Sequence, residues 1–433
     1  MTPFSSTSIW WMDKAPSTLR LNFAEFLDFV MHALSRLAPE VRQYLLVTGN
    51  YWAFTLTDGA LRMLVVLHFH SLGYTPLQIA ALFLFYEIFG VVTNLVGGWL
   101  GARIGLNRTM NLGLALQVLA LLMLTVPAAM LTVPWVMGAQ ALSGIAKDLN
   151  KMSAKSSIKL LVPGEQQATL YTWVARLTGS KNALKGVGFF LGGALLSLLG
   201  FAGAVLAMAL ALGAIWLASL ALLKKDLGKA KAKPKFRDLL SKSRAINILS
   251  AARLFLFGAR DVWFVVALPV YLATVYGWDF WWVGGFLAVW IIGYGIVQSL
   301  APAITGKRSG QVPDGRAAFA WAVLAGLPAA IALGLGSALP TQAVLIGGLL
   351  AFGVLFAVNS SLHSYLIVSY AQEDGVSLDV GFYYMSNALG RLLGTLLSGW
   401  VFQSWGLAAC LWVSSAFVLA AALISLGLPR HRA

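Results

Sequence analysis

The chain has 433 residues, of which 59% are hydrophobic and only 11% are charged, with a formal net charge of +15 at pH 7. Soluble domains carry about 25% charged residues, so this chain has too few polar side chains to cover several soluble domains. The composition therefore predicts an all-α membrane protein that crosses the bilayer many times. The single cysteine, Cys410, excludes a disulfide framework or a thiolate metal cluster within one chain.

Apolar runs between turn signals predict twelve transmembrane helices, because a helix needs about 20 mainly apolar residues to cross a bilayer. The first six are expected at 44–70, 76–101, 107–131, 133–160, 168–198 and 200–223. The second six are expected at 246–273, 279–304, 316–336, 340–369, 379–403 and 405–428. Two six-helix bundles, 44–223 and 246–428, would then be joined by a basic linker at 224–245.

Lysine and arginine are concentrated in every second loop, in the linker and near both ends of the chain. Basic loops stay in the cytoplasm, so both termini are expected there, and most of the net charge reflects topology rather than nucleic-acid binding. Residues 1–43 lack a secretory signal and form a cytoplasmic extension. This extension is either an amphipathic helix on the membrane surface or a dispensable segment before an alternative start at Met31. Residues 429–433 form a short cytoplasmic tail.

Short sequence matches recur between the two predicted bundles at an offset of 204 or 205 residues. They pair Gly73-Tyr74 with Gly277-Trp278, Arg103 with Lys307, Ser156-Ser157 with Ser360-Ser361, and Asn182-Ala183-Leu184 with Asn387-Ala388-Leu389. Two parallel six-helix repeats with a basic central loop resemble the major facilitator superfamily. The loop GWLGARIGLNR (98–108) resembles that superfamily's signature, but Ala102 stands where an aspartate is usual, which calls the usual charge-pair latch into question.

Charged side chains recur near the middle of the predicted spans. Lys147, Lys151, Lys155 and Lys159 follow one another at every fourth position, which places them on one stripe of a helix. A charge at the centre of a membrane helix costs about 3 kcal/mol, so the deeper lysines are expected to face a water-filled cavity or a partner charge.

At mid-depth seven cations accompany four carboxylates, a net charge of +3 that is unfavourable unless an anion occupies the cavity. Arginine offers bidentate contacts to an oxyanion, and lysine offers a point charge. The predicted substrate-binding residues are Arg62, Lys147, Lys151, Lys181, Lys185, Arg260 and Arg391. The candidates for proton coupling or ion pairing are Asp58, Glu87, Asp148 and Asp261. The candidates for gating or for lining the cavity are Asn50, Tyr51, Lys155, Arg253 and Asn387.

Local pairing competes with substrate binding at several of these positions. Asp58 and Arg62 have i, i+4 spacing and can pair with each other, and Asp148 can neutralise a nearby lysine. Lys181 and Lys185 share a helix that carries no carboxylate, which favours a ligand. The sequence has no G-x-x-x-x-G-K-[ST] loop for a nucleotide, so we expect a transporter without a cofactor rather than an enzyme. Transport would then use an ion gradient, a counter-anion or neither.

Several long stretches resemble the ArsJ organoarsenical efflux permeases: NYWAFTLTDGALRMLVVLHFHSLGY (50–74), LFYEIFGVVTNLVGGWLGARIGLNRTMN (84–111), SGIAKDLNKMSAKSSIKLLVP (143–163), GSKNALKGVGFFLGG (179–193) and SAARLFLFGARDVWFVVALPVYL (250–272). The resemblance implies export of 1-arseno-3-phosphoglycerate across the bacterial inner membrane, and hence arsenate resistance. It also implies glyceraldehyde-3-phosphate dehydrogenase as the functional partner that supplies this ester. A multiply charged pentavalent oxyanion suits a cationic cavity, whereas trivalent arsenic would call for thiolates. The alternative is an organophosphate/phosphate antiporter of the same superfamily.

Overall fold

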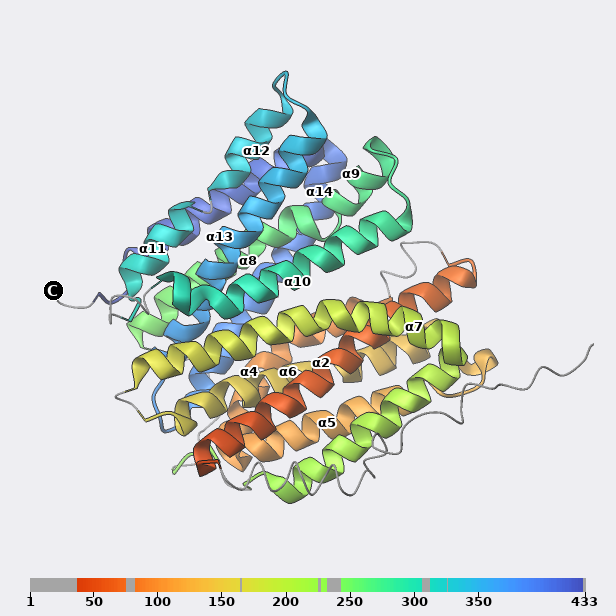
Figure 1. Cartoon of the computed structure of the whole chain (residues 1–433), viewed down its shortest axis with the longest axis vertical. Helices are drawn as coiled ribbons and strands as arrows, with labels where there is room; N and C mark the ends of the chain where they lie inside the picture. The colour runs from red at the N-terminus through yellow and green to blue at the C-terminus, as the bar shows by residue number, and fades with distance from the viewer. Residues whose placement is uncertain are drawn as a thin grey trace, which may run out of the picture.

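The computed structural model describes residues 37–74, 82–163, 166–224, 227–231, 243–305, 312–324 and 326–430. All regular elements in these ranges are helical, and seven of the described helices are long and apolar enough to cross a membrane. Most of the predicted N-terminal extension and most of the basic linker lie outside the described residues. The helices form two bundles, one from each half of the chain (Figure 1).

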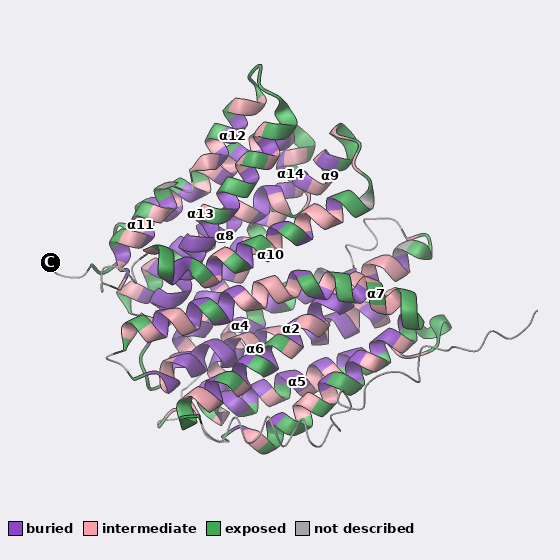
Figure 2. Cartoon of the chain, viewed as in Figure 1, coloured by how far each residue is buried: buried purple, intermediate pink, exposed green. Residues whose placement is uncertain are grey.

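The N-terminal half consists of α2 (Pro39–Ser71), α4 (Leu84–Ile104), α5 (Leu106–Met123), the 3₁₀ turn η2 (Ala128–Met130), α6 (Val133–Leu161) and α7 (Gln167–Leu222). The C-terminal half consists of α8 (Arg244–Phe264), α9 (Ala267–Val275), α10 (Phe280–Thr305), α11 (Gly315–Leu324), α12 (Leu327–Leu335), α13 (Thr341–Tyr370) and α14 (Val376–Ser425). Many large apolar side chains on their outer faces are exposed, as expected for surfaces that contact lipid (Figure 2).

Two long helices each contain two of the predicted spans. The backbone of α7 bends at Gly200, where φ is 67°, and that of α14 bends at Gly406, where φ is 79°. Only glycine adopts positive φ readily, so each of these residues lets the chain turn back without a separate loop. With both bends counted, the described helices supply the twelve predicted spans.

Prolines account for the places where the predicted span boundaries are wrong. The span expected at 107–131 ends at Met123, ahead of the turn at Pro127 and η2. The spans expected at 246–273 and 316–336 are each divided into two helices, α8 with α9 and α11 with α12. Pro269 and Pro328 lie at the start of the second helix in each case, where a missing N–H costs little.

The two halves repeat the same helix packing. In the N-terminal half α2 packs along α7, and in the C-terminal half α8 packs along α14. Gly188 of α7 lies so close to Gly59 of α2 that a Cβ there would lie 3.1 Å from the Gly59 Cα. Gly73 and Gly277, which the repeat predicts to be equivalent, both have positive φ, at 84° and 67°.

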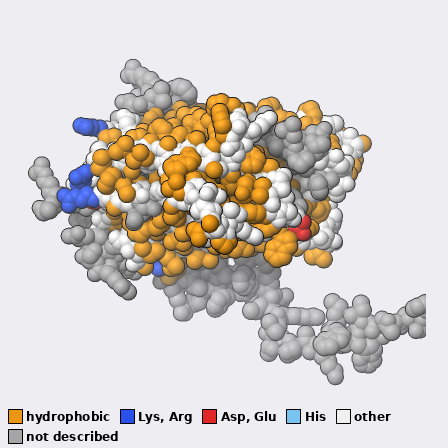
Figure 3. Space-filling model, turned by 90° about the horizontal axis from the view of Figure 1, so that it is seen from above, with side chains coloured by type: hydrophobic (Ala, Val, Ile, Leu, Met, Phe, Trp, Pro, Cys, Tyr) orange, Lys and Arg blue, Asp and Glu red, His pale blue; other side chains and the backbone are white. Residues whose placement is uncertain are grey.

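The halves touch each other through α4 with α14 and through α7 with α10. Glycines make these contacts close: a Cβ on Gly381 would lie 2.8 Å from the Asn94 carbonyl oxygen, and Gly295 lies directly against the backbone of Gly179. These contacts lie toward the end of the bundle that holds the C terminus, where lysine and arginine side chains gather (Figure 3). We call this the basic end. Towards the opposite end α7 and α10 diverge (Figure 1).

We predict that Gly381→Leu wedges the two halves apart at the basic end. Overpacking of a close contact typically costs about 1–3 kcal/mol, so thermal unfolding of the purified protein in detergent should shift to a lower temperature. Gly399→Leu is the matched control, because Gly399 lies on the same helix and a Cβ there would meet nothing within 4 Å. Equal destabilisation by both substitutions would contradict a tight glycine contact between the halves.

Candidate functional site

The lysine stripe of α6 begins among carboxylates and aromatic rings of the N-terminal half. The Nζ of Lys147 lies 3.7 Å from the centre of the Tyr86 ring, and that of Lys151 lies 2.6 Å from the Asp148 carboxylate. Asp148 is fully buried and Lys151 is half-buried. One local pairing considered for this stripe is therefore present, because Asp148 neutralises Lys151.

Further along the same stripe the lysines cross to the C-terminal half. Lys155, which is 3% exposed, donates a hydrogen bond to the Tyr384 hydroxyl on α14. Lys159 donates to the Ser369 carbonyl oxygen on α13 at 3.0 Å. The stripe therefore lies along the interface between the halves, and its end near the chain's basic loops holds them together.

On α2, Asp58 and Arg62 approach Tyr86 from the same side. The Tyr86 hydroxyl donates to the Asp58 carboxylate at 2.7 Å, and the Arg62 guanidinium lies 4.7 Å from the centre of the same ring. Within the described part of the chain, Asp58 thus takes a tyrosine as its hydrogen-bond partner. Tyr51, which is 1% exposed, lies within electrostatic range of Asp58.

Lys181 and Lys185 on α7 are half-buried at mid-depth. Lys181 contacts the Asn182 side-chain oxygen at 3.3 Å. Lys185 has no hydrogen-bond or ion-pair partner among the residues that the structure describes, although it interacts electrostatically with Asp58, Arg62 and Arg391. An ammonium group in a low-dielectric interior is unfavourable without a partner, so Lys185 is a ready contact for an anionic ligand.

In the C-terminal half, one carboxylate serves two arginines. The fully buried Asp261 accepts hydrogen bonds from Arg260 at 2.6 Å and from Arg391 at 3.0 Å. The Arg391 side chain keeps 31% of its surface exposed, so it can be reached by a ligand. Arg391 also lies within electrostatic range of Lys185 on the other half.

Arg253, by contrast, is held within the protein framework. It is 2% exposed, donates to the Asn387 side-chain oxygen at 2.8 Å and to Ser360, and packs 3.8 Å from the centre of the Phe257 ring. Gln298 extends this network, since it donates to Ser360 and accepts from Asn182 of α7 at 2.6 Å. Arg253 and Asn387 therefore belong to a link between the halves rather than to the open part of the cluster.

Two further candidates are Asn50 and Glu87. The Asn50 amide donates to the Ser219 hydroxyl at 2.8 Å and contacts the Met110 sulfur. Asn50 therefore faces α5 and the end of α7, and its role as a gate or cavity residue stays a prediction. Glu87 lies on α4 beside Tyr86, but its side chain is outside the described atoms.

Sequence reasoning named Tyr51 but missed two other tyrosines of the site, Tyr86 and Tyr384. Tyr86 receives Lys147 and Arg62 on its ring, and Tyr384 receives Lys151 and Lys155. Such cation–π contacts contribute more when they are removed from water. The one available signal was a tyrosine inside an otherwise apolar span, which is too common to single out a site.

The assembled cluster is strongly positive. Its three described carboxylates are Asp58, Asp148 and Asp261. Its nine lysines and arginines come from α2, α6, α7, α8 and α14, and they are Arg62, Lys147, Lys151, Lys155, Lys181, Lys185, Arg253, Arg260 and Arg391. Among the described residues, no group of three histidine, cysteine or acidic side chains could hold a metal ion. Cations from both halves that surround one region are suited to binding an oxyanion that touches both halves at once.

Comparison with known proteins agrees with this architecture. Residues 45–377 match the Major Facilitator Superfamily. The chain belongs to this superfamily. It is therefore a multi-pass membrane transporter and not an enzyme, and its two halves are the two bundles of that fold. A search of curated proteins found no match to the chain.

Solved transporters share the fold at low sequence identity. The human organic anion transporter MFSD10 has a TM-score of 0.71 at 18% identity and covers 90% of this chain and 100% of its own. The E. coli fucose:proton symporter has a TM-score of 0.69 at 14% identity, covering 90% and 99%. A bacterial homologue of the iron transporter ferroportin, in an outward-facing state, has a TM-score of 0.66 at 16% identity, covering 88% and 98%.

We predict that Asp261→Asn destabilises the transporter, because it leaves Arg260 and Arg391 without their carboxylate. Removing one partner from a buried ion pair typically costs about 3–5 kcal/mol, which should appear as a lower unfolding temperature in anion-poor buffer. The double variant Asp261→Asn with Arg391→Gln should recover part of this loss, since it removes one of the stranded charges. No recovery in the double variant would contradict the shared-carboxylate arrangement.

Proposed function

We propose that this transporter exports 1-arseno-3-phosphoglycerate, a pentavalent organoarsenical, from the cytoplasm by alternating access. The observation that carries the proposal is the excess of positive charge at the interface of the halves, centred on Lys185 and Arg391. The resemblance to ArsJ permeases in the stretches that hold Arg62, Lys147, Lys181 and Arg260 supports arsenic as the distinguishing element of the substrate.

The chemistry of this ester suits the two halves in different ways. It carries an oxyanion at each end, and the N-terminal half offers mainly lysines while the C-terminal half offers arginines. Lysine supplies a mobile point charge, and arginine grips an oxyanion through two donors. We expect one oxyanion at Lys181 and Lys185 and the other at Arg391, where it would share the guanidinium with Asp261.

The proposed direction of transport rests on the orientation of the protein and on the compartment in which the ester would form. The basic end would face the cytoplasm of a bacterium, because basic loops stay on that side of the inner membrane. Glyceraldehyde-3-phosphate dehydrogenase would form the ester there from arsenate, and export would confer arsenate resistance. Asp58, held by the Tyr86 hydroxyl, and Glu87 are the candidates for proton coupling.

We predict that everted membrane vesicles accumulate arsenic only when arsenate is supplied together with glyceraldehyde-3-phosphate, NAD and the dehydrogenase. Lys181→Ala should reduce this accumulation by about thirtyfold or more, because losing one partner of a desolvated charge contact costs at least about 2 kcal/mol. Lys229→Ala is the matched control, since Lys229 is an exposed lysine outside the cluster.

Each other outcome points to a different substrate. Equal accumulation from arsenate alone would reject the ester in favour of a simple oxyanion exporter. Exchange of labelled 3-phosphoglycerate against phosphate, without arsenic uptake, would favour the organophosphate/phosphate antiporter. That antiporter remains the second candidate because the same cations would bind either oxyanion.

A further inference from the structure

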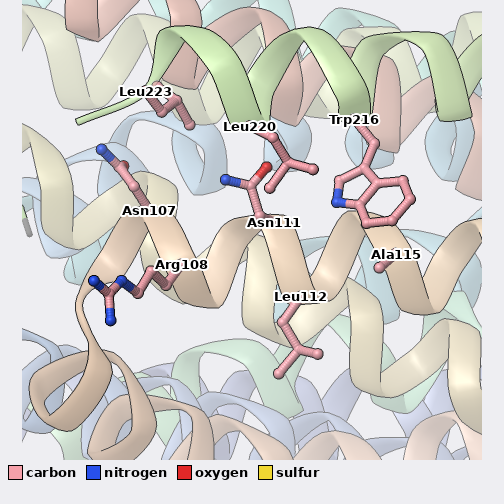
Figure 4. Close-up of a pocket in the computed structure, with 8 residues that line it drawn as sticks. All are labelled: Asn107, Arg108, Asn111, Leu112, Ala115, Trp216, Leu220 and Leu223. Atoms are coloured by element: carbon pink, nitrogen blue, oxygen red, sulfur yellow. The ribbon is translucent and has the colours of Figure 1, made fainter. Parts of the chain in front are cut away.

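A second polar site lies on the outer surface of the N-terminal half, away from the central cluster. A cavity of about 490 Å³ opens between α5 and the second half of α7 and is lined by Asn107, Arg108, Asn111, Leu112, Ala115, Trp216, Leu220 and Leu223. Figure 4 shows the α5 side chains facing Trp216, Leu220 and Leu223 across this crevice. Leu112 and Leu220 are 41% and 45% exposed, so the crevice opens on the apolar surface that faces lipid.

Three polar atoms in this crevice lack a hydrogen-bond partner among the described residues. They are the side-chain oxygens of Asn107 and Asn111 and the indole N–H of Trp216. Asn107 is 1% exposed, and its amide nitrogen is already used, because it donates to the Lys224 carbonyl oxygen at 2.8 Å. An unmade hydrogen bond at a buried group costs about 1–3 kcal/mol, so two acceptors and one donor call for a ligand that both donates and accepts.

The order of these groups along α5 matches the order of groups in a membrane lipid. The exposed Arg108 lies at the basic end, next to Asn107, and the helix then carries Asn111, Leu112 and Ala115. At about 1.5 Å of rise per residue, Ala115 lies about 10 Å deeper than Arg108. A cation therefore comes first, polar groups follow one turn deeper, and apolar side chains come last.

We propose that this crevice binds one glycerophospholipid of the leaflet at the basic end, with a head group that bears a hydrogen-bond donor. The guanidinium of Arg108 contacts the phosphate, and the indole N–H of Trp216 donates to a phosphate or ester oxygen. The oxygen of Asn107, which lies beside Arg108 at the basic end, accepts from the ammonium of phosphatidylethanolamine or the hydroxyls of phosphatidylglycerol. One acyl chain then lies along Leu112, Ala115 and Leu220. Phosphatidylcholine has no such donor and binds less well.

The pseudo-equivalent surface of the C-terminal half provides an internal control. There α11 begins near Arg316, an exposed arginine close to the basic end. The 204-residue offset places Gly315 at the position of Asn111 and Ala420 at the position of Trp216, so Arg316 is a nearby cation that lacks these two polar partners. If surface charge alone retained lipid, the two arginines would be interchangeable.

The test is native mass spectrometry of the full-length protein in detergent, titrated with phosphatidylethanolamine, phosphatidylglycerol or phosphatidylcholine of identical acyl chains. We expect one of the first two lipids to be retained per chain and phosphatidylcholine to be retained about tenfold less, as for the loss of one hydrogen bond to a charged group. Arg108→Ala and Trp216→Phe should each reduce retention by a similar factor, and Arg316→Ala should leave it unchanged. Trp216→Phe keeps the ring and removes only the donor, so it reports on the site even if Arg108→Ala folds poorly.

Three results would overturn the proposal. Equal retention of the three lipids would mean that the head group is not recognised. Equal losses from Arg108→Ala and Arg316→Ala would reduce the effect to surface charge. Displacement of the bound lipid by millimolar inorganic phosphate would assign the site to a soluble phosphate compound instead.

Discussion

The constraint on which this structure depends is the cost of holding like charges in a low-dielectric interior. The cluster contains more cations than the described carboxylates can neutralise, and a buried charge without a partner is very unfavourable. The cations are therefore stabilised in different ways. Lys147 lies on the face of an aromatic ring, Lys151 pairs with Asp148, and Arg391 shares the Asp261 carboxylate with Arg260. Among the described residues, Lys185 has no aromatic ring beneath it and no ion-pair partner. This leaves the centre of the protein suited to an anion.

The two halves share one architecture but carry different charged residues. The glycine contacts that bring α2 against α7 and α8 against α14 are repeated, as are the glycine turns at Gly200 and Gly406. The charged residues are not repeated, because the N-terminal half places lysines on α6 and α7 while the C-terminal half places arginines on α8 and α14. A duplicated scaffold therefore carries a site that is chemically different on its two sides, as expected for a substrate with two distinct ends.

The fold was largely predictable from sequence, because apolar length and the 204-residue repeat are properties of the chain alone. Span boundaries were less predictable near Pro127, Pro269 and Pro328, where a missing N–H competes with apolar periodicity. For the site, depth along each helix identified the cations, since a mid-span charge is rare whatever its partners. The rotation of each helix about its axis could not be read from the sequence, so the partner of Asn50 and the role of Tyr86 were missed. The partner of each charged side chain could not be predicted either, because it often comes from a distant segment of the chain. Arg391 and its partner Asp261 are an example.

The fixed positive charge between the halves also makes the protein sensitive to voltage. Moving one elementary charge through 100 mV changes the free energy by about 2.3 kcal/mol. When the empty cluster changes the side to which it is open, its excess charge moves through part of that field. A negative interior then draws the empty form toward the cytoplasm, whereas an anion that neutralises Lys185 and Arg391 reduces the electrical work of moving outward. Under the proposed orientation and direction of export, the return of the empty carrier is the step that the membrane potential drives.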